Sequence, residues 1–462
     1  MEELLSEAID YGLGKGCRYV ELRVQRMNST KIEVRNGKVI SAIPGIECGV
    51  AIRVLADDGW GFTSTTQLDI ENLRRCVDNA VKYASASGQD TSGVGMLNTP
   101  IVREKVALIV REPVAETPIE RKIRTVLEVD EASRKVDERV KTTIRYVDQQ
   151  GEKYLANSDG SFIREDESWI YIDVLAYAFE AGVVQSYRKK FGVVNGFEAL
   201  RKVDLEEMGR EASKKALNLL KAEHAPAGKL PVIIDEDLAG LLAHEAFGHA
   251  SEADLVLEGK SLLAGKLGLK IASEKVSIAD DSTLNEFGSF KYDDECVRGG
   301  RKLIVQKGIL KKFMSSRETS FKLGIPLTGN ARAQNYENKP IVRMSNTFFE
   351  KGDMTFEELI EDIDFGVYAR GGRGGQVSTV DGVFQFGAQE AFLIEKGEIT
   401  KPLRDFSMSG FILTTLRNVN GVGRKVKLTP GFCGKFNQVV RVSSGGPHLR
   451  IREILVGGRK WI

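Results

Sequence analysis

The sequence predicts an α+β protein, in which helices pack on antiparallel hairpin sheets in the N-terminal region and a β-rich C-terminal domain follows. Apolar residues alternate with polar ones over several segments, as in strands, and follow helical spacing in others. Turn signals such as Asn36-Gly37 join strand-like segments directly, as antiparallel hairpins require. Glycine becomes dense after Leu230, where short strand-like runs alternate with turns. These three observations favour antiparallel hairpin sheets in the N-terminal region and a β-rich C-terminal domain.

The N-terminal region, residues 1–222, is expected to contain two sub-units, 1–90 and 101–222. The first sub-unit is predicted to comprise a helix over 1–14, a strand over 19–26, a hairpin at Asn36-Gly37, a strand around 48–54 and a helix over 70–84. Val20, Leu22 and Val24 alternate with polar residues, which indicates a half-buried strand. The segment 85–100 is small, polar and without apolar periodicity, so we interpret it as a linker or surface loop.

The second sub-unit repeats the order of helix and hairpins. A helix beginning near Pro118 is expected to precede strands around 140–147, 150–157 and 162–178, and a helix over 204–222 closes the region. Asp159-Gly160 marks a turn between two of the strands. Proline and glycine in 223–229 indicate a boundary. Residues 223–462 are therefore predicted to form a separate, β-rich domain with one or two helices near its start.

Composition limits the classes of protein to which the chain can belong. Of its 462 residues, 42% are hydrophobic and 28% charged, the usual globular mix. No apolar run approaches the ~18 residues of a membrane span, and MEELLSEAIDYG lacks the features of a signal peptide. The five cysteines are sparse, as in a reduced compartment. A net charge of +1 gives no sign of nucleic-acid binding. We expect a cytoplasmic protein without membrane or nucleic-acid partners.

Histidine is rare, and its distribution points to a metal. Of four histidines, His244 and His249 lie in one short window, HEAFGH. The window follows a predicted buried strand, 232–234, and a helix that Asp235 or Asp237 is expected to cap. In the familiar HExxH helix the two histidines are about 40° apart, whereas five-residue spacing gives about 140° on a straight α-helix.

Both imidazoles reach one metal only if the helix changes its geometry. A π-bulge brings five residues close to one turn. Alternatively, Gly248 lets the backbone leave the helix just before His249. The second alternative, or a mixture of the two, is our expectation, because a glycine stands where the break is needed. The competing interpretation is a chance pair of surface histidines, since HExxxH is a weak motif by itself.

If both histidines bind one metal, Glu245 is placed to hold a metal-bound water and take its proton. A third ligand is then required. The candidates are Cys433, His448, Glu252, Asp254 and Cys296. Cys433 lies in a stretch rich in turn residues, TPGFCGK, where we expect a loop and an exposed thiolate, a good zinc ligand. A lone cysteine is more commonly a small buried hydrophobe. His448 is the second choice.

Several longer blocks resemble a known family. HEAFGHASEAD, GGRGGQVSTVDGVFQFGAQEAFLIEKGEIT, TPGFCGKFNQ and SGGPHLRI are together similar to the catalytic branch of the TldD/PmbA family, and the resemblance spans nearly the whole chain. It implies a cytoplasmic metallopeptidase that hydrolyses short or unfolded peptides with one Zn²⁺ per chain, although another divalent metal is possible. His244, His249 and Cys433 would be the ligands and Glu245 the catalytic residue.

The resemblance also implies an assembly around an enclosed cavity, as a homodimer or as a heterodimer with a TldE/PmbA-like partner that lacks HExxxH. Two alternatives to the peptidase remain at this stage. One is a zinc amidohydrolase acting on a small molecule, and the other is a non-enzymatic or regulatory binding protein with a structural metal. The run Gly371–Gly375 is either a plain tight loop or a stretch of backbone that pairs with an extended peptide.

Overall fold

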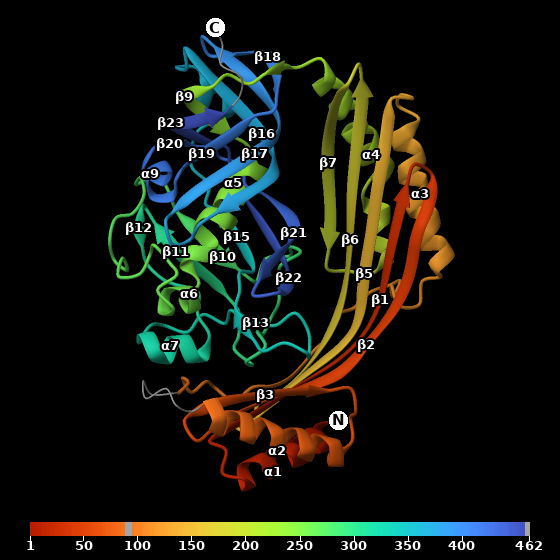
Figure 1. The fold of residues 1–462 in the computed structure, drawn as a ribbon, viewed down its shortest axis with the longest axis vertical. Helices are drawn as coiled ribbons and strands as arrows, with labels where there is room; N and C mark the ends of the chain where they lie inside the picture. The colour runs from red at the N-terminus through yellow and green to blue at the C-terminus, as the bar shows by residue number, and fades with distance from the viewer. Residues whose placement is uncertain (88–94, 458–462) are drawn as a thin grey trace.

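The alternating segments of the first half fold into long strands of one seven-stranded sheet (Figure 1). The computed structural model describes residues 1–87 and 95–457. The strands lie in the order β3-β2-β1-β5-β6-β4, with β7 paired to β6, and only β4 runs parallel to its neighbour. Their bounds are β1 Tyr19–Arg35, β2 Lys38–Ala56, β3 Gly59–Thr65, β4 Arg103–Val106, β5 Val140–Asn157, β6 Phe162–Glu180 and β7 Val183–Val193.

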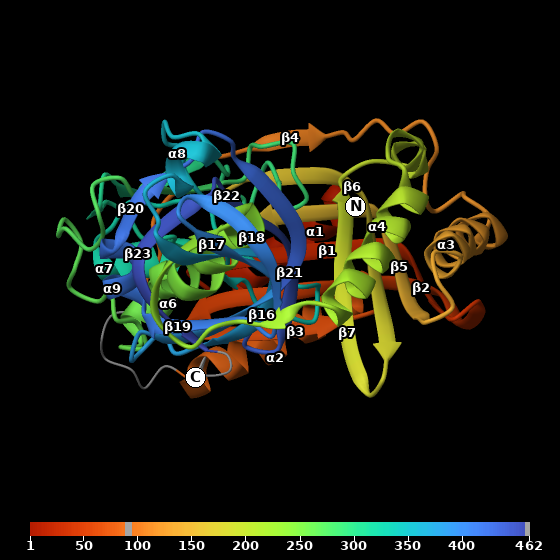
Figure 2. The same cartoon turned by 90° about the horizontal axis from the view of Figure 1, so that it is seen from above.

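Two pairs of helices cover one face of this sheet at its two ends. Along β1, Val20 and Leu22 enter the core under the first pair, and Ile32 and Val34 enter the core under the second. Figure 2 shows the second pair on the side turned away from the C-terminal half. The first pair is α1 Glu2–Gly14 and α2 Ile70–Ser87, and the second is α3 Ile119–Arg134 and α4 Leu205–Leu220, preceded by the 3₁₀ helix Phe197–Lys202.

The predicted hairpin and helices are confirmed, whereas the strands are longer than expected, because the segments 19–26 and 48–54 are each continuous with one arm of the hairpin. Asn36 and Gly37 have φ of 48° and 78°, as the tight turn between β1 and β2 requires. The two strands expected at 140–147 and 150–157 are one continuous strand, β5. No turn separates them, because Gly151 continues the pairing with β1, where an added Cβ would lie 1.9 Å from the Arg26 carbonyl oxygen.

The polar face of β1 is buried rather than exposed, which corrects the prediction of a half-buried strand. Glu21 is 3% and Arg23 4% exposed, because this face packs against the C-terminal half. Arg53 of β2 contacts Glu21 at 2.8 Å and Glu295 of the C-terminal half at 2.7 Å. The Glu295 carboxylate also accepts a hydrogen bond from the Arg317 backbone N–H. The polar residues that alternate with apolar ones along β1 therefore contact the C-terminal half instead of solvent.

The second half contains two larger sheets and one small one. The six-stranded sheet has the order β12-β11-β10-β15-β22-β21. In the eight-stranded sheet, β16, β9, β23, β19 and β17 close into a ring, because β16 also pairs with β17. The strands are β8 Glu223–His224, β9 Gly228–Ile234, β10 Ile278–Asp281, β11 Arg301–Gln306, β12 Ile309–Leu310, β13 Ala331–Arg332, β14 Ile341–Val342, β15 Asn346–Phe349, β16 Phe365–Val377, β17 Val383–Glu395, β18 Glu398–Arg404, β19 Ser407–Phe411, β20 Val419–Val422, β21 Lys427–Lys435, β22 Gln438–Gly446 and β23 Leu449–Gly457.

Short helices connect these strands. They are α5 Glu236–Leu241, α6 Ala253–Leu257, α7 Arg317–Leu323, α8 Phe356–Ile360 and α9 Ile412–Arg417. Of the linker expected at 85–100, residues 88–94 lie outside the described part, and 95–100 form neither helix nor strand. None of the helices in the described ranges is both long and apolar enough to cross a membrane. The α+β fold class is confirmed.

The Arg53 network predicts a large loss of stability on substitution. Arg53→Met leaves the Glu21 and Glu295 carboxylates buried without their cation, so we expect the free energy of unfolding to fall by about 3–5 kcal/mol. Urea titration followed by circular dichroism measures the change. Arg74→Met is the matched control, because the Arg74–Glu7 pair is 45% and 52% exposed and should contribute no more than about 1 kcal/mol. Equal losses in the two variants would contradict this account.

Candidate metal centre

A strand, a capped helix and a π-helix follow one another directly in the segment that carries both histidines. β9 ends at Ile234, and the Asp235 side chain accepts a hydrogen bond from the Leu238 N–H at 3.0 Å, so Asp235 is the N-cap of α5. From Leu242 to Gly248 the backbone is a π-helix, and a short 3₁₀ turn, His249–Ser251, follows it. The expected strand and helix are confirmed, and Asp235 is the cap.

The π-helical alternative is the one found, and the π-helix ends at Gly248, but the expectation that the backbone leaves the helix before His249 is wrong. Gly248 keeps helical angles, φ −56° and ψ −53°. The wider turn brings the His244 and His249 rings to a centroid distance of 5.2 Å, nearly perpendicular to each other. Glycine is required here for close packing, because a Cβ at this position would lie 2.2 Å from the Met344 sulfur.

Cys433 completes a group of three ligand atoms. One ligand atom each from His244, His249 and Cys433 all lie within 4.8 Å of one another, and Cys433 Sγ is 3.4 Å from His249 Nε2. His244 Nδ1 is buried and has no hydrogen-bond partner, which is costly unless something else binds there. Two imidazoles and one thiolate are donors that zinc prefers, so the residues fit a bound metal ion.

The surroundings of Cys433 differ from the loop predicted for it. Cys433 lies within β21, opposite Val440 of β22, and is 2% exposed. The glycines and proline around it suggested a turn, but β21 pairs with β22 along its whole length. The sulfur therefore points into the protein interior, where the two histidines meet it, rather than toward solvent.

The three side chains shift one another's pKa values, as expected for a thiolate beside two protonated imidazoles. Burial by itself raises the pKa of the Cys433 thiol, but His244 and His249 hold it well below its usual range. Burial likewise disfavours charged imidazoles, whereas Cys433 raises the pKa of His244 and Glu252 raises that of His249 well above its usual value. A metal ion bound here would take the place of the imidazole protons, with the thiolate already formed.

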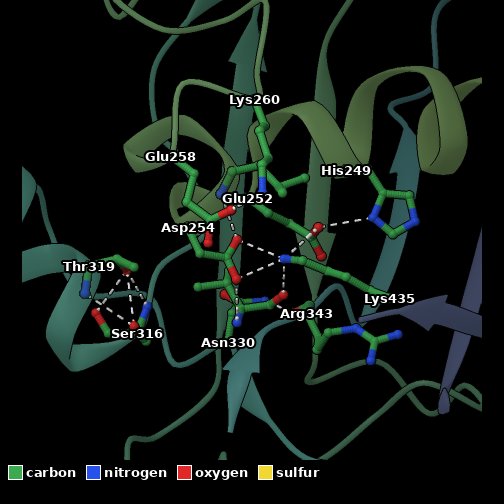
Figure 3. A network of polar contacts seen from close by, with 12 residues as sticks. His249, Glu252, Asp254, Glu258, Lys260, Ser316, Thr319, Asn330, Arg343 and Lys435 are labelled. Carbon is green, nitrogen blue, oxygen red and sulfur yellow. Dashed lines mark hydrogen bonds and ion pairs between the residues drawn. The ribbon is translucent and has the colours of Figure 1, made fainter. Parts of the chain in front are cut away.

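A buried ion network lies behind His249, as Figure 3 shows. The fully buried Glu252 carboxylate lies 2.9 Å from His249 Nδ1, and the Lys435 ammonium donates to Glu252 at 3.0 Å and to Asp254 at 2.7 Å. Burial raises the pKa of Glu252, but Lys435 and His249 together lower it to about 2. The carboxylate therefore fixes the imidazole so that its Nε2 faces Cys433.

The other candidates for a third ligand have different partners. Glu252 and Asp254 are bound to Lys435 as described. His448 contacts the Tyr368 hydroxyl at 2.8 Å and Glu236 at 3.5 Å. Cys296 is buried in a small apolar cluster that Tyr292 shares.

A cavity of about 650 Å³ opens beside His244. His244 and Glu245 line one side of it, and the Glu245 side chain is 38% exposed, with an oxygen 3.8 Å from His249 Nε2. Strand β7 of the N-terminal sheet contributes Arg188 and Lys190 to the opposite side. The cavity thus lies between the two halves, and Glu245 faces its interior next to the candidate ligands.

The glycine run forms part of this wall. Gly372, Arg373 and Gly374 line the cavity, and the run lies in strand β16 rather than in a tight loop, with an irregular register opposite β17. Two of its backbone amides are already bound, because Gly371 N–H donates to Asp235 and Gly372 N–H donates to Asp237. Pairing of the remaining backbone with a peptide stays a prediction.

Sequence reasoning missed Lys435 and the contribution of β7. Lys435 lies two residues after Cys433, so both side chains lie on the same face of β21. This two-residue spacing is informative only in a strand, and the turn residues of TPGFCGK predict a loop. Arg188 and Lys190 carry no local signal, because their place in the cavity depends on how the two halves pack.

Comparison with known proteins covers nearly the whole chain. The family model of the PmbA/TldA metallopeptidase C-terminal domain matches residues 227–458, that of domain 1 matches 20–84, and that of the central domain matches 112–220. A protein named metalloprotease from Methanothermobacter thermautotrophicus is 43% identical over 95% of each chain. A protein named zinc metalloprotease TldD homolog from Saccharolobus solfataricus is 30% identical over 96% of this chain and 97% of its own.

A solved structure shares the fold. The crystal structure of TldE from Thermococcus kodakarensis has a TM-score of 0.81 and covers 98% of this chain and 100% of that chain, at 20% identity. At this identity the likeness shows the fold alone.

The network behind His249 predicts an effect on metal affinity. Glu252→Gln preserves the shape of the side chain but removes the charge that orients the imidazole, so we expect the dissociation constant for a divalent metal to rise about 10–100-fold. Competition with a chromophoric chelator measures the constant. Glu258→Gln, which changes the exposed Glu258–Lys260 pair six residues away, serves as the control. Unaltered affinity in Glu252→Gln would show that Glu252 does not position the ligand.

Proposed function

Since this chain belongs to the PmbA/TldD family of metallopeptidases, we propose that it hydrolyses short or unfolded peptides with Zn²⁺ held by His244, His249 and Cys433. The observation that carries the proposal is the convergence of these three side chains, with ligand atoms within 4.8 Å of one another, beside a cavity that His244 and Glu245 line. The thiolate favours zinc over harder cations, and the name of the Saccharolobus relative supports the same metal.

The residues have separate tasks in this mechanism. Zinc, when bound, lowers the pKa of a water and polarises the peptide carbonyl. Glu245 is next to a ligand and open to the cavity, so it accepts the water proton and passes it to the leaving amine. Glu252 keeps the His249 ring in place while this occurs. Burial of His244 and Cys433 keeps bulk water away from the ligands themselves.

A non-enzymatic protein with a structural metal fits the geometry less well. Structural zinc sites use four protein ligands, whereas catalytic sites keep an open position. Among the described residues only His244, His249 and Cys433 form a group that could hold a metal ion, and the neighbouring acid faces a cavity. An amidohydrolase acting on a small molecule would share this site. The cavity of about 650 Å³ between the two halves is large enough for several peptide residues, which favours the peptidase.

The fold of a related protein and the cysteines bear on the assembly and the cellular location of the protein. We propose a dimer, either with a second copy or with a TldE/PmbA-like partner, because TldE has the same fold as this chain. The cytoplasm is the proposed compartment, since all five cysteines are unpaired. A net charge of +1 agrees with a peptide rather than a nucleic acid as substrate.

The proposal predicts that Glu245→Gln separates metal binding from turnover. Gln cannot accept the water proton, so we expect hydrolysis of an unstructured peptide to fall at least about 100-fold. Metal content, measured by atomic emission, should stay near one ion per chain. His244→Ala is the comparison variant and should lose metal and activity together. If Glu245→Gln cleaves the peptide at the wild-type rate, Glu245 has no role as proton acceptor.

A further inference from the structure

A second cavity, of about 400 Å³, lies between the N-terminal sheet and the C-terminal half. Phe432 lines both this cavity and the metal cavity, and the residue that follows it is Cys433. The Phe432 ring contacts Trp169 and Tyr171 of β6 at centroid distances of 5.8 and 5.0 Å. The two cavities therefore meet at an aromatic side chain, with the candidate metal ligand directly beside it in the chain.

Arg332 lines the second cavity and is a buried cation without an acid partner. Its side chain is only 9% exposed, and no carboxylate lies within 4.0 Å of it among the described residues. One Nη donates to the Met344 carbonyl at 2.6 Å, and the guanidinium lies over the Phe290 ring. A guanidinium carries five N–H donors, so most of them remain unused. Burial of such a group is costly unless a negative charge joins it.

Most of the acids nearby already have other partners, which are cations or, for Asp293, backbone N–H groups. Asp294 lies 3.1 Å from Lys153 and 3.9 Å from Arg23, and Glu167 lies 3.4 Å from Lys153. Arg441, also in the wall, has Glu167 at 3.9 Å. Burial, and then the neighbouring Arg441 and Arg343, lower the pKa of Arg332 to about 10, although Asp294 and Asp280 act in the opposite direction. Arg332 itself therefore has no carboxylate of the described residues within 4.0 Å, although the cavity lining as a whole holds as many acidic as basic side chains.

We propose that this cavity is a substrate subsite in which the Arg332 guanidinium binds a carboxylate of the peptide. A carboxylate matches the guanidinium in charge and in its paired geometry. The walls near it include Trp169, Phe290 and Phe432, which provide apolar contacts for neighbouring side chains. An extended peptide held there passes Phe432 to reach the metal cavity. The proposal rests on the peptidase function and specifies its substrates further, as peptides bearing a carboxylate at a fixed side of the cleaved bond.

Three synthetic peptides test the subsite and the source of the carboxylate. They share one neutral, unstructured sequence and differ at the end, which is a free carboxylate, a carboxamide, or a carboxamide with one glutamate nearby. For the metal-loaded wild type we expect kcat/KM to be about tenfold to a hundredfold higher for a peptide with a carboxylate than for the neutral amide. Preference for the free acid identifies the C-terminus as the source, and preference for the glutamate peptide identifies an acidic side chain.

Substitutions assign the preference to Arg332. Arg332→Met should cleave the three peptides with equal kcat/KM, and Arg332→Lys should retain part of the preference. Arg301→Met, which removes an arginine that is 50% exposed and paired with Glu350, should keep the full preference. Thermal unfolding of each variant checks the fold. Equal kcat/KM for all peptides in the wild type, or a preference that survives in Arg332→Met, overturns the proposal.

A binding measurement separates the subsite from the catalytic function. Fluorescence anisotropy with labelled versions of the same peptides gives their affinities for metal-loaded Glu245→Gln and for the double variant Glu245→Gln/Arg332→Met. If the wild type cleaves no peptide but Glu245→Gln prefers carboxylate peptides and the double variant does not, the subsite stands and the peptidase proposal fails. If the wild type cleaves peptides and binding shows no preference, the peptidase proposal stands and the subsite fails.

Discussion

The five-residue spacing of His244 and His249 is the constraint on which the rest of the site depends. An α-helix would direct these side chains to nearly opposite faces, so the chain forms a π-helix between Leu242 and Gly248. A π-helix is rarely stable alone and needs support from its surroundings. The Asp235 cap fixes the start of α5, which leads directly into the π-helix, and the close contact of Gly248 with Met344 fixes the packing of the π-helix. Glu245 then faces the cavity next to the proposed metal ligands.

Buried ion pairs connect segments of the chain in two places, one beside the site and one between the two halves. Near the proposed metal site, Lys435 connects β21, which carries Cys433, to the Glu252 carboxylate that holds His249. Farther away, Arg53 and Glu295 join the N-terminal sheet to the C-terminal half. Buried ion pairs contribute little net stability compared with apolar packing, but they define geometry. Both cavities lie between the two halves that the Arg53–Glu295 pair joins, so their shape depends on this contact.

Local patterns in the sequence predict the elements well and the site in part. Asn36-Gly37, the alternation along β1 and the strand and cap before HEAFGH all act through neighbouring residues, and these predictions agree with the structure. The π-helix, the burial of Cys433 in β21 and the buried polar face of β1 depend on contacts between distant segments. Arg332 gives no local signal at all, since an arginine without a partner is recognised only after the fold places its neighbours.

X-ray absorption at the zinc edge of the metal-loaded protein tests the central claim most directly, that one metal ion is held by two imidazoles and one thiolate with a position left open. The account predicts one sulfur at about 2.3 Å and nitrogen or oxygen neighbours at about 2.0–2.1 Å, with the sulfur lost in Cys433→Ser. A first shell without sulfur, or one in which the sulfur remains after that substitution, would contradict it.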